Sequence, residues 1–372
     1  MSVDWLIVGA GYTGCVLAER IAGQLDQSVL LVDRRGHIGG NAYDYYNEQG
    51  ILIHKYGPHI FHTNSQRVWD YLCQFTTWRS YEHRVLAAVE GQKIPVPFNL
   101  NSLARLVPRA RAEGLEARLN ALYGAGAHVP ILRMLESDDA DVRALAEMVY
   151  KLIFYKYTLK QWGLAPEQLD PSVTGRVPVR ISRDDRYFQD TYQAMPSDGY
   201  TAMFQRMLRH PKIEVRVDTD FRTIGSDVRF NRMVYTGPID AYFDYIHGPL
   251  PYRSLRFDVQ TVDREWSQEV GTINYPNDAP YTRITEFKHL TGQESARTAV
   301  VTEYPMAHQP GENEPYYPVP REENRERYAR YQKEADRLRA TVLFAGRLAD
   351  YKYYNMDQAV ARALKLFEDT IS

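Results

Sequence analysis

The sequence predicts an α/β protein in which a parallel-sheet domain that binds a dinucleotide is interrupted by a helical domain and an antiparallel sheet. Three observations support this prediction. An apolar run opens the chain and leads into glycines with G-x-G-x-x-G spacing, a long helical pattern fills the middle, and strand patterns bounded by turn signals follow. A chain of 372 residues also exceeds the usual size of a single core, so more than one domain is expected.

Composition and charge narrow the classes of function. The net charge is −2, which predicts neither a nucleic acid nor a membrane as partner. The two cysteines, Cys15 and Cys73, exclude a disulfide framework and a cysteine zinc cluster. The chain starts directly on a strand pattern, with no basic leader region and no apolar span of about 18 residues. A soluble, cytoplasmic protein is therefore the expectation.

The first 40 residues carry the dinucleotide signal. Gly9 permits a tight turn after the first strand pattern, Gly11 lets a pyrophosphate approach the backbone, and Gly14 lets the following helix pack closely. A second strand pattern ends at Asp33, about 20 residues further on, where a carboxylate can accept the hydroxyls of a ribose. This order predicts a Rossmann-like site with the pyrophosphate at the helix N-terminus.

Two further segments favour FAD as the dinucleotide. The stretch RRGHIGGNAYD, 34–44, places Gly39-Gly40 shortly after Asp33, and it resembles the pattern of flavoproteins of the two-dinucleotide-binding type. Near the C-terminus, TVLFAGR at 341–347 predicts a strand that ends in Gly-Arg, and a helical pattern follows it. In flavoproteins of this type such a strand and helix return to the cofactor. The alternative is an αβ unit that only completes the sheet.

The middle of the chain departs from the βαβ pattern. Residues 85–100 predict a hairpin with a Gly turn, 101–163 predict helices, and 252–263 and 297–305 predict strands. The charged helix expected at 321–340 carries a tyrosine stripe typical of scaffold. The predicted domains are a discontinuous FAD-binding domain (1–84, 195–250 and 335–372), a helical domain (98–165), and an antiparallel-sheet substrate domain (85–97, 166–194 and 251–334).

The stretch GPHIFHT, residues 57–63, holds two histidines three positions apart behind a Gly-Pro pair. Neither a paired carboxylate nor a third ligand stands at useful spacing, so His59 and His62 do not predict a metal site. No nucleophile motif for acyl transfer accompanies them. A structural turn and a wall facing the cofactor both stay open on the residues alone.

Seven strings, in their order and spacing, resemble the bacterial UDP-galactopyranose mutase family over essentially the whole chain. They are GGNAYD (39–44), HKYGPHIFHT (54–63), PFNLNSL (97–103), YTLKQWG (157–163), TGRVPVR (174–180), YPNDAPYTRITEFKH (275–289) and FAGRLADYKYYNMD (344–357). The resemblance implies an isomerase that interconverts UDP-galactopyranose and UDP-galactofuranose, a precursor of cell-surface glycans. It implies reduced FAD and no net redox. It also implies that the flavin N5 nitrogen attacks the anomeric carbon, that UDP leaves, and that a flavin–sugar iminium lets the ring close again as the furanose.

The same resemblance assigns roles to individual residues. Arg176 and Arg283 are expected to clamp the diphosphate, because planar guanidinium donors suit phosphate oxygens. Arg176 lies in a Gly- and Arg-rich stretch that predicts a mobile loop near 174–187. His59 and His62 are expected at the flavin, and which of them assists there stays open. The residues expected at the substrate are Asn99, Phe154, Tyr157, Trp162, Tyr187, Asn274, Tyr317 and Tyr353. Those expected at the cofactor are Gly9, Gly11, Gly14, Asp33, Arg34, Gly40, Asn41, His59, Arg347 and Met356.

Phe154 and Tyr157 lie three apart on a predicted helix, so they share a face that suits a uracil platform or a core stripe. One position departs from the family: where relatives often carry an aspartate, this chain has Asn355, which is uncharged and both donates and accepts. Galactose and its 2-acetamido form both stay open as the sugar. A homodimer or higher homo-oligomer is expected, with apolar helix faces in 101–163 as the candidate contact.

Two alternatives to the mutase stay open at this point. An FAD-dependent oxidase or dehydrogenase on the same fold would act on an amine or similar small molecule and has no use for a diphosphate clamp. A nucleotide-binding protein without enzymatic activity would leave the predicted loop and the flavin wall without a role.

Overall fold

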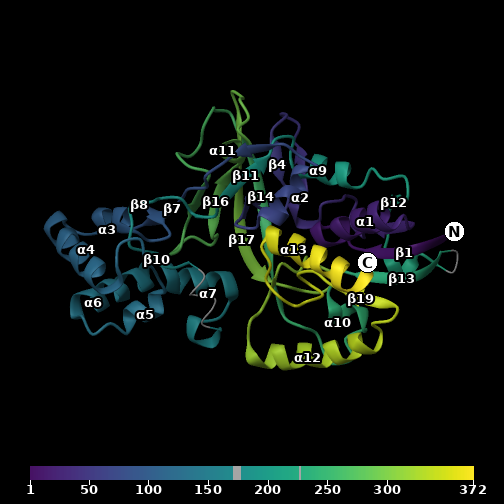
Figure 1. The fold of residues 1–372 in the computed structure, drawn as a ribbon. Helices are drawn as coiled ribbons and strands as arrows, with labels where there is room; N and C mark the ends of the chain where they lie inside the picture. The colour runs from purple at the N-terminus through teal and green to yellow at the C-terminus, as the bar shows by residue number, and fades with distance from the viewer. Residues whose placement is uncertain (171–176, 226–227) are drawn as a thin grey trace. The chain divides into compact units, whose positions relative to one another are not determined.

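The computed structural model describes residues 1–170, 177–225 and 228–372, and these form two compact units (Figure 1). Unit 1 consists of Met1–Tyr81, Asp190–Tyr252 and Glu323–Ser372. Unit 2 consists of Glu82–Gln189 and Arg253–Glu322. Each unit is therefore assembled from separated stretches of the chain.

Unit 1 contains a five-stranded sheet in which all neighbouring strands run parallel. Its strand order is β12 (Ile213–Arg216), β2 (Val29–Val32), β1 (Ser2–Val8), β13 (Arg229–Tyr235) and β19 (Val342–Phe344). All four residues of β2 are buried, as expected of a parallel strand covered on both faces. The late strand predicted at 341–347 is β19, and it pairs with β13. The α/β fold class is confirmed.

Helices and two small sheets complete unit 1. Helix α1 (Tyr12–Leu25) follows β1 directly and packs against α13 (Met356–Leu366). The charged helix predicted at 321–340 is α12 (Glu322–Arg337), and its Tyr331 is fully buried among apolar residues, which confirms the scaffold interpretation. The other elements are α2 (Gln66–Cys73), α9 (Tyr200–Met207), α10 (Ile239–Tyr242), the sheet β5 (Phe61–Thr63), β11 (Tyr192–Pro196) and β6 (Trp78–Ser80), and the pair β3 (Asp44–Tyr46) and β4 (Leu52–His54).

Unit 2 contains a seven-stranded sheet that is antiparallel except where β15 runs parallel to β7. Its order is β18 (Tyr317–Pro318), β14 (Tyr252–Val262), β17 (Thr298–Ala307), β16 (Arg283–Glu286), β15 (Thr272–Asn274), β7 (Val85–Val89) and β8 (Gln92–Val96). The predicted hairpin is confirmed as β7–β8, and both turn residues, Glu90 and Gly91, have positive φ, as a two-residue hairpin turn requires.

The helices of unit 2 enclose a core of their own. They are α3 (Leu100–Leu106), α4 (Arg109–Tyr123), α5 (Ile131–Leu135), α6 (Ala140–Val149) and α7 (Lys156–Trp162), with α11 (Phe287–Thr291) beside β16. Asp139 caps α6 by accepting the N–H groups of Asp141 and Val142, and Gly163 ends α7 with a positive φ. The sequence predicts one helical pattern here, but a π-helical turn at Tyr150–Tyr155 separates α6 from α7. A wider turn of this kind shifts the faces that follow it.

Residues 179–187 of the loop predicted near 174–187 are hydrogen-bonded to the rest of unit 2, and the mobility of this loop stays a prediction. Strand β10 (Val179–Arg180) pairs with β9 (His128–Val129), and the Leu100 N–H donates to the Ser182 carbonyl at 3.0 Å. At the far end, the Tyr187 N–H donates to the His83 carbonyl at 2.6 Å. Gly and Arg content suggests flexibility, but it does not indicate these hydrogen bonds. Residues 174–176 lie outside the described part of the chain.

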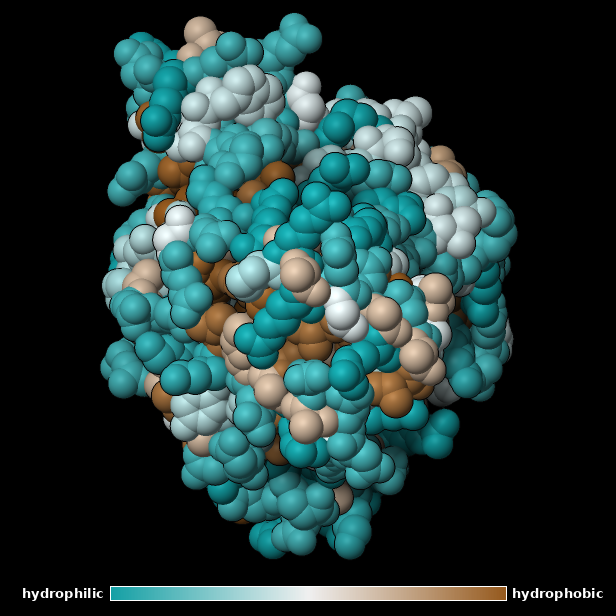
Figure 2. All heavy atoms as spheres, turned by 90° about the vertical axis from the view of Figure 1, so that its left-hand side faces the viewer, coloured by the Kyte–Doolittle hydropathy of each residue, from teal (hydrophilic) through white to brown (hydrophobic). Residues whose placement is uncertain are grey.

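The surface over the helices of unit 2 is mixed. Figure 2 shows this side, with apolar side chains set between hydrophilic ones. Within the range predicted to hold a dimer contact, the large exposed apolar residues are Leu122, Tyr155 and Leu159. Among the described residues, no helix combines the length and the apolar character needed to span a bilayer.

Candidate functional site

The turn between β1 and α1 in unit 1 needs two glycines for reasons internal to the protein. Gly9 has a φ of +103°, and a Cβ there would lie 2.0 Å from the Thr236 Oγ1. A Cβ on Gly14 would lie 1.9 Å from the Gly9 carbonyl oxygen. Side chains are therefore excluded by the left-handed backbone at Gly9 and by the tight approach of helix to turn at Gly14.

Gly11 is different, because nothing in the protein requires it to be glycine. Its φ is −83°, an ordinary extended conformation, and a Cβ there would meet only the Gly40 Cα at 3.8 Å, a normal contact. Gly40 in turn has a positive φ, and its own Cβ would lie 2.9 Å from the Gly11 Cα. The space that the missing side chain leaves open at the N-terminus of α1 fits a dinucleotide phosphate.

Asp33 and the Gly39-Gly40 segment hold this turn in shape. The Asp33 carboxylate accepts the Ala10 N–H at 2.8 Å and the Arg35 N–H at 2.9 Å. The Gly39 N–H donates to the Ala10 carbonyl at 2.7 Å. Each Asp33 oxygen retains acceptor capacity, so a ribose hydroxyl can still bind there. Of the other predicted cofactor residues, Asn41 accepts from Arg35 at 3.0 Å, and Arg34 is exposed.

The C-terminal segment returns to this turn, as the sequence predicts. Gly346, after β19, has a φ of +106°, and a Cβ there would lie 3.1 Å from the Thr13 Oγ1 in α1. Arg347 donates to the Tyr354 carbonyl and lies 4.9 Å from the centre of the Tyr353 ring. Helix α13 then begins at Met356, with Asn355 as its N-cap residue.

The histidine stretch of unit 1 is held by buried groups. The His59 N–H donates to the His54 Nδ1 at 3.1 Å, so His54 carries its proton on Nε2. Burial lowers the pKa of His54 to about 3, which keeps this acceptor neutral. The Tyr200 hydroxyl donates to the His59 carbonyl at 3.1 Å, and the His59 Nδ1 lies 2.9 Å from the Gly57 carbonyl oxygen. Hydrogen bonds from buried groups therefore hold the backbone of GPHIFHT, residues 57–63, in place.

His62 has a carboxylate partner. Its Nδ1 lies 2.9 Å from the Asp190 Oδ2, and the Asn64 amide donates to the other oxygen of Asp190. A carboxylate on Nδ1 fixes the ring and favours proton transfer at the opposite nitrogen. The ring of His62 is therefore oriented for acid–base work. No group of three or more potential metal ligands occurs among the described residues.

The neutral His54 makes a testable prediction about acid stability. Its pKa falls from 6.5 to about 3 on folding, so the unfolded chain binds the extra proton as the pH drops below about 6.5. Stability is therefore lost between those two values, by about 2 kcal/mol at about pH 5. We expect His54→Asn, which keeps a neutral acceptor, to remove most of that loss. Urea unfolding of both proteins at about pH 7.5 and about pH 5 measures it, and an equal acid loss in the variant contradicts it.

In unit 2, three neighbouring strands place three polar side chains in one row. Asn274 on β15 lies opposite Arg283 on β16, and Arg283 lies opposite Glu303 on β17. Residues directly opposite each other point to the same face of a sheet. Arg283 donates from Nε and Nη2 to the Glu303 Oε2, at 2.8 and 2.7 Å. Thr282 donates to the Glu303 Oε1 at 3.1 Å, so this buried carboxylate is satisfied on both oxygens.

Two tyrosines, Tyr157 and Tyr317, lie within electrostatic range of Arg283, and a third, Tyr187, acts on Tyr157. Burial raises the pKa of Tyr157 well above its usual value, and Arg283, Glu303, Tyr187 and Tyr317 all act on the same hydroxyl. For Arg283, burial alone would lower the pKa, but the Glu303 carboxylate outweighs it and the pKa rises. The structure therefore brings together four residues that the sequence predicts at the substrate or its diphosphate, namely Tyr157, Tyr187, Tyr317 and Arg283. The Trp162 ring joins them, 6.2 Å from the Tyr317 ring.

Lys160 ties the helix that carries Tyr157 to the strands that carry Arg283. Its Nζ donates to the Tyr275 and Tyr281 carbonyls at 2.7 and 3.0 Å, in the connection between β15 and β16. Burial lowers its pKa to about 8, with only partial compensation from Asp278. Lys160 therefore stabilises the arrangement in which α7 and β16 contribute to one cluster.

Two predicted substrate residues are buried in unit 2, and their contact with substrate stays a prediction. Asn99 is buried at the start of α3, where its Oδ1 accepts two backbone N–H groups and its Nδ2 donates to Asp185 at 2.9 Å. This amide is fully used within the protein. Phe154 is 8% exposed and packs in the helical core of unit 2, so its ring offers little surface to a base. Arg176 lies outside the described residues, and Tyr353 belongs to unit 1.

Three residues of these clusters were missed by sequence reasoning. Glu303 could have been found, because in the strand pattern RTAVVTEYP at 297–305 it is the one charged residue after Arg297, which stands at the pattern's start. Asp190 carries no such signal, since it lies 128 positions from His62. Lys160 belongs to the string YTLKQWG, but a lysine that donates to backbone carbonyls leaves no pattern in sequence.

Comparison with known sequences identifies a family. A family model for UDP-galactopyranose mutase matches residues 152–353, and one for an NAD(P)-binding Rossmann-like domain matches residues 7–75. A probable UDP-galactopyranose mutase from Klebsiella pneumoniae is 36% identical, covering 99% of this chain and 94% of that protein. A UDP-galactopyranose mutase from Mycoplasma pneumoniae is 35% identical (99% and 96%), and a dTDP-fucopyranose mutase from Escherichia coli is 33% identical (97% and 96%).

Comparison with solved structures supports the fold. The crystal structure of a reduced UDP-galactopyranose mutase superposes with a TM-score of 0.74 at 16% identity, covering 99% of this chain and 93% of that one. A putrescine oxidase bound to putrescine superposes with a TM-score of 0.56 at 14% identity, covering 100% and 99%. At these identities the likeness shows a fold shared by mutases and oxidases, and the chemistry must be argued from the site.

Proposed function

Because the chain belongs to the UDP-galactopyranose mutase family, we propose that it interconverts UDP-galactopyranose and UDP-galactofuranose with FAD as cofactor. One observation in unit 2 supports this most strongly. A buried glutamate fixes Arg283 in a row of polar residues, two tyrosines lie within electrostatic range of it, and a third acts on one of these two. Such a cluster suits a diphosphate, because a guanidinium and phenol hydroxyls all donate to phosphate oxygens.

The cofactor part of the proposal rests on unit 1. The Gly11 cradle and the N-terminus of α1 would hold the pyrophosphate, and Asp33 would take a ribose hydroxyl. The returning Gly346 and the start of α13 supply the second approach to the same turn. When bound in its reduced form, FAD would supply the nucleophilic N5 nitrogen that joins covalently to the anomeric carbon while UDP departs, with no net redox.

The chain's own residues would then hold the departing nucleotide. Charge develops on the diphosphate as its bond to the sugar breaks, and a prearranged cation stabilises that charge without reorganising. Glu303 keeps Arg283 in one orientation, since two of its nitrogens donate to a single carboxylate oxygen. Arg176 is proposed as the second cation on the basis of the family match. His62, oriented by Asp190, is proposed to move a proton at the sugar or flavin.

A relative named for another nucleotide sugar requires that the substrate be tested. The Escherichia coli dTDP-fucopyranose mutase is 33% identical, close to the 36% and 35% of the two UDP-galactopyranose mutases. The two substrates differ in the base and in the sugar. The assay should therefore offer UDP-galactofuranose, its 2-acetamido analogue and dTDP-fucofuranose separately.

The decisive experiment is an anaerobic conversion assay. The flavin-loaded protein is reduced with dithionite, given UDP-galactofuranose, and the nucleotide sugars are separated by chromatography, with an oxidised sample beside it. We expect UDP-galactopyranose to form in the reduced sample only. Conversion of dTDP-fucofuranose alone would reassign the substrate within the same chemistry.

The oxidase alternative predicts a different result in the same assay. No conversion of any nucleotide sugar by a protein with bound, reducible flavin, together with oxygen-dependent turnover of an amine, would overturn the mutase. A homodimer and a cytoplasmic location stay predictions.

A further inference from the structure

Arg180 is a buried cation with an unusual set of partners. The residue is 5% exposed on β10, and its backbone is fixed by pairing with His128 and by an N–H donated to the Phe98 carbonyl at 2.8 Å. Its Nε is buried and has no hydrogen-bond partner among the described residues. Burial lowers its pKa, and the nearby Asp184 compensates only in part. A charge buried this way is costly, so its presence calls for a function.

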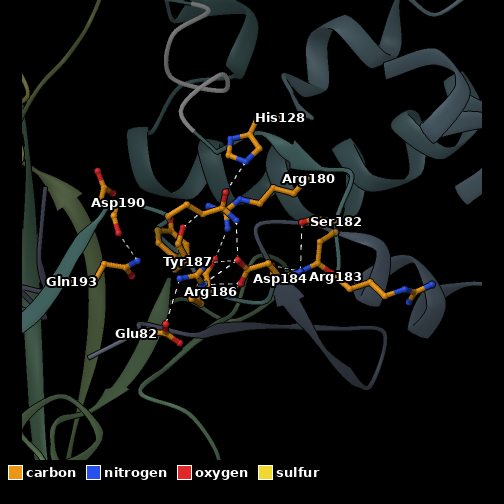
Figure 3. A network of polar contacts seen from close by, with 12 residues as sticks. Glu82, His128, Arg180, Ser182, Arg183, Asp184, Arg186, Tyr187, Asp190 and Gln193 are labelled. Atoms are coloured by element: carbon orange, nitrogen blue, oxygen red, sulfur yellow. Dashed lines mark hydrogen bonds and ion pairs between the residues drawn. The ribbon is translucent and has the colours of Figure 1, made fainter. Parts of the chain in front are cut away.

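The guanidinium of Arg180 is directed at two consecutive backbone carbonyls. Its Nη2 donates to the Tyr187 carbonyl at 2.7 Å, and its Nη1 donates to the Arg186 carbonyl. Figure 3 shows the side chain reaching across the loop to these groups. The planar guanidinium presents its two donors on separate nitrogens in a fixed fork, whereas a lysine ammonium carries all its donors on one atom and would have to draw both carbonyls to that atom.

The rest of the loop is braced separately. Arg186 donates to Asp184 through Nε and Nη2, at 3.0 and 2.6 Å, which closes the turn between them. The Tyr187 N–H donates to the His83 carbonyl at 2.6 Å. The peptide groups on both sides of the Tyr187 Cα are therefore clamped, one by His83 and the other by Arg180. The Tyr187 side chain is therefore attached to a backbone segment that is held in place.

We propose that Arg180 is a positioning residue that holds Tyr187 where its hydroxyl meets the diphosphate of the bound nucleotide. This rests on the proposed function, because Tyr187 acts electrostatically on Tyr157, which in turn lies within range of Arg283. Arg180 itself touches no substrate. It acts through the Arg186 and Tyr187 carbonyls, and its planar shape, rather than its charge alone, is what the site uses.

The first test reads the position of Tyr187 without any nucleotide. Tyr187 is replaced by 3-fluorotyrosine in the flavin-loaded protein, and its ¹⁹F resonance is recorded in the parent and in Arg180→Lys. We expect a shifted or broadened resonance in Arg180→Lys. The matched control is Arg183→Lys, an exposed arginine of the same loop that pairs with Glu116, and it should leave the resonance unchanged. An identical resonance in Arg180→Lys and parent would overturn the proposal.

The second test is a double-mutant cycle on UDP affinity, measured by calorimetry on the flavin-loaded protein. Loss of one charge-assisted hydrogen bond predicts about 10-fold weaker binding for Tyr187→Phe and for Arg180→Lys. If Arg180 acts through Tyr187, the double variant should also lose about 10-fold, whereas independent effects would give about 100-fold. Additive losses, or wild-type affinity in Arg180→Lys, would overturn the role in binding. A wild-type protein that binds no nucleotide diphosphate would contradict the proposed function instead, and the ¹⁹F result would still decide the position of Tyr187.

Discussion

Replacing Arg283 with alanine is expected to lower turnover by on the order of 100-fold or more, as loss of a charge-assisted donor at a developing anion does. Arg283 is held by Glu303 through two of its nitrogens, so its orientation is set before substrate arrives. Arg283→Lys keeps the charge but loses the planar fork, and we expect it to recover only a small part of the rate. Rates are measured anaerobically on the reduced protein, at equal flavin content.

A simple loss of stability must be separated from this effect. Arg283→Ala leaves the Glu303 carboxylate buried and unpaired, which costs about 3–5 kcal/mol when one member of a buried pair is removed. The control is therefore Arg283→Met combined with Glu303→Gln, which removes both charges. We expect this double variant to be as stable as the parent in urea unfolding and still slow by a similar factor. Turnover near that of the parent would remove Arg283 from the diphosphate clamp.

The dinucleotide half of the fold could be predicted because each of its steps is local. A strand, a tight glycine turn, a helix and a second strand ending at Asp33 follow one another within 33 residues. The glycine requirements at Gly9 and Gly14 arise from atoms of the same turn and its immediate neighbours. The return of β19 and α13 to the β1–α1 turn was predicted only through resemblance to flavoproteins. No pattern in residues 341–367 indicates which part of the fold they contact.

The partners of the catalytic candidates could not be predicted, because they depend on pairing between distant segments. Arg283 meets Glu303 through the register of β16 and β17, and His62 meets Asp190 across 128 positions. Composition predicts mobility in the loop before Tyr187, but it does not indicate what the arginines bind. Arg180 uses its donors on carbonyls six and seven residues away, which no composition pattern reveals.

Side-chain amides and helix faces show the same limit on a smaller scale. Asn99 lies in a family string, but the helix that begins there uses its oxygen as an N-cap. Phe154 and Tyr157 share a face only if the helix keeps regular spacing, and the π-helical turn at Tyr150–Tyr155 intervenes. One extra residue in a turn leaves no mark in the apolar pattern.

Replacing Gly11 with valine is expected to remove flavin from a protein that still folds. The backbone at Gly11 is extended and the nearest atom to a Cβ is 3.8 Å away, so a side chain fits the protein itself. That side chain would fill the space in which the pyrophosphate must approach the N-terminus of α1. Forcing a ligand against added methyl groups costs about 1–3 kcal/mol, which corresponds to about 5- to 150-fold weaker FAD binding. Flavin absorbance per protein, and titration of the flavin-free protein with FAD, measure the effect.

Valine substitutions at two other glycines of α1, Gly23 and Gly14, serve as controls for Gly11→Val. Gly23→Val changes an exposed glycine of α1 whose Cβ would meet only the Glu19 side chain at 3.5 Å, so it should leave both flavin content and stability unchanged. Gly14→Val places a side chain 1.9 Å from the Gly9 carbonyl and should disrupt folding as well as binding. Gly11→Val is expected to behave between these two variants. Its thermal stability should equal that of the flavin-free parent, but its affinity for FAD should be lower than the parent's. If the variant keeps its flavin, the open space at Gly11 serves no ligand, and the dinucleotide must bind elsewhere in unit 1. If it fails to fold, the glycine is required by the protein after all, and the physical argument that distinguishes Gly11 from Gly14 is wrong.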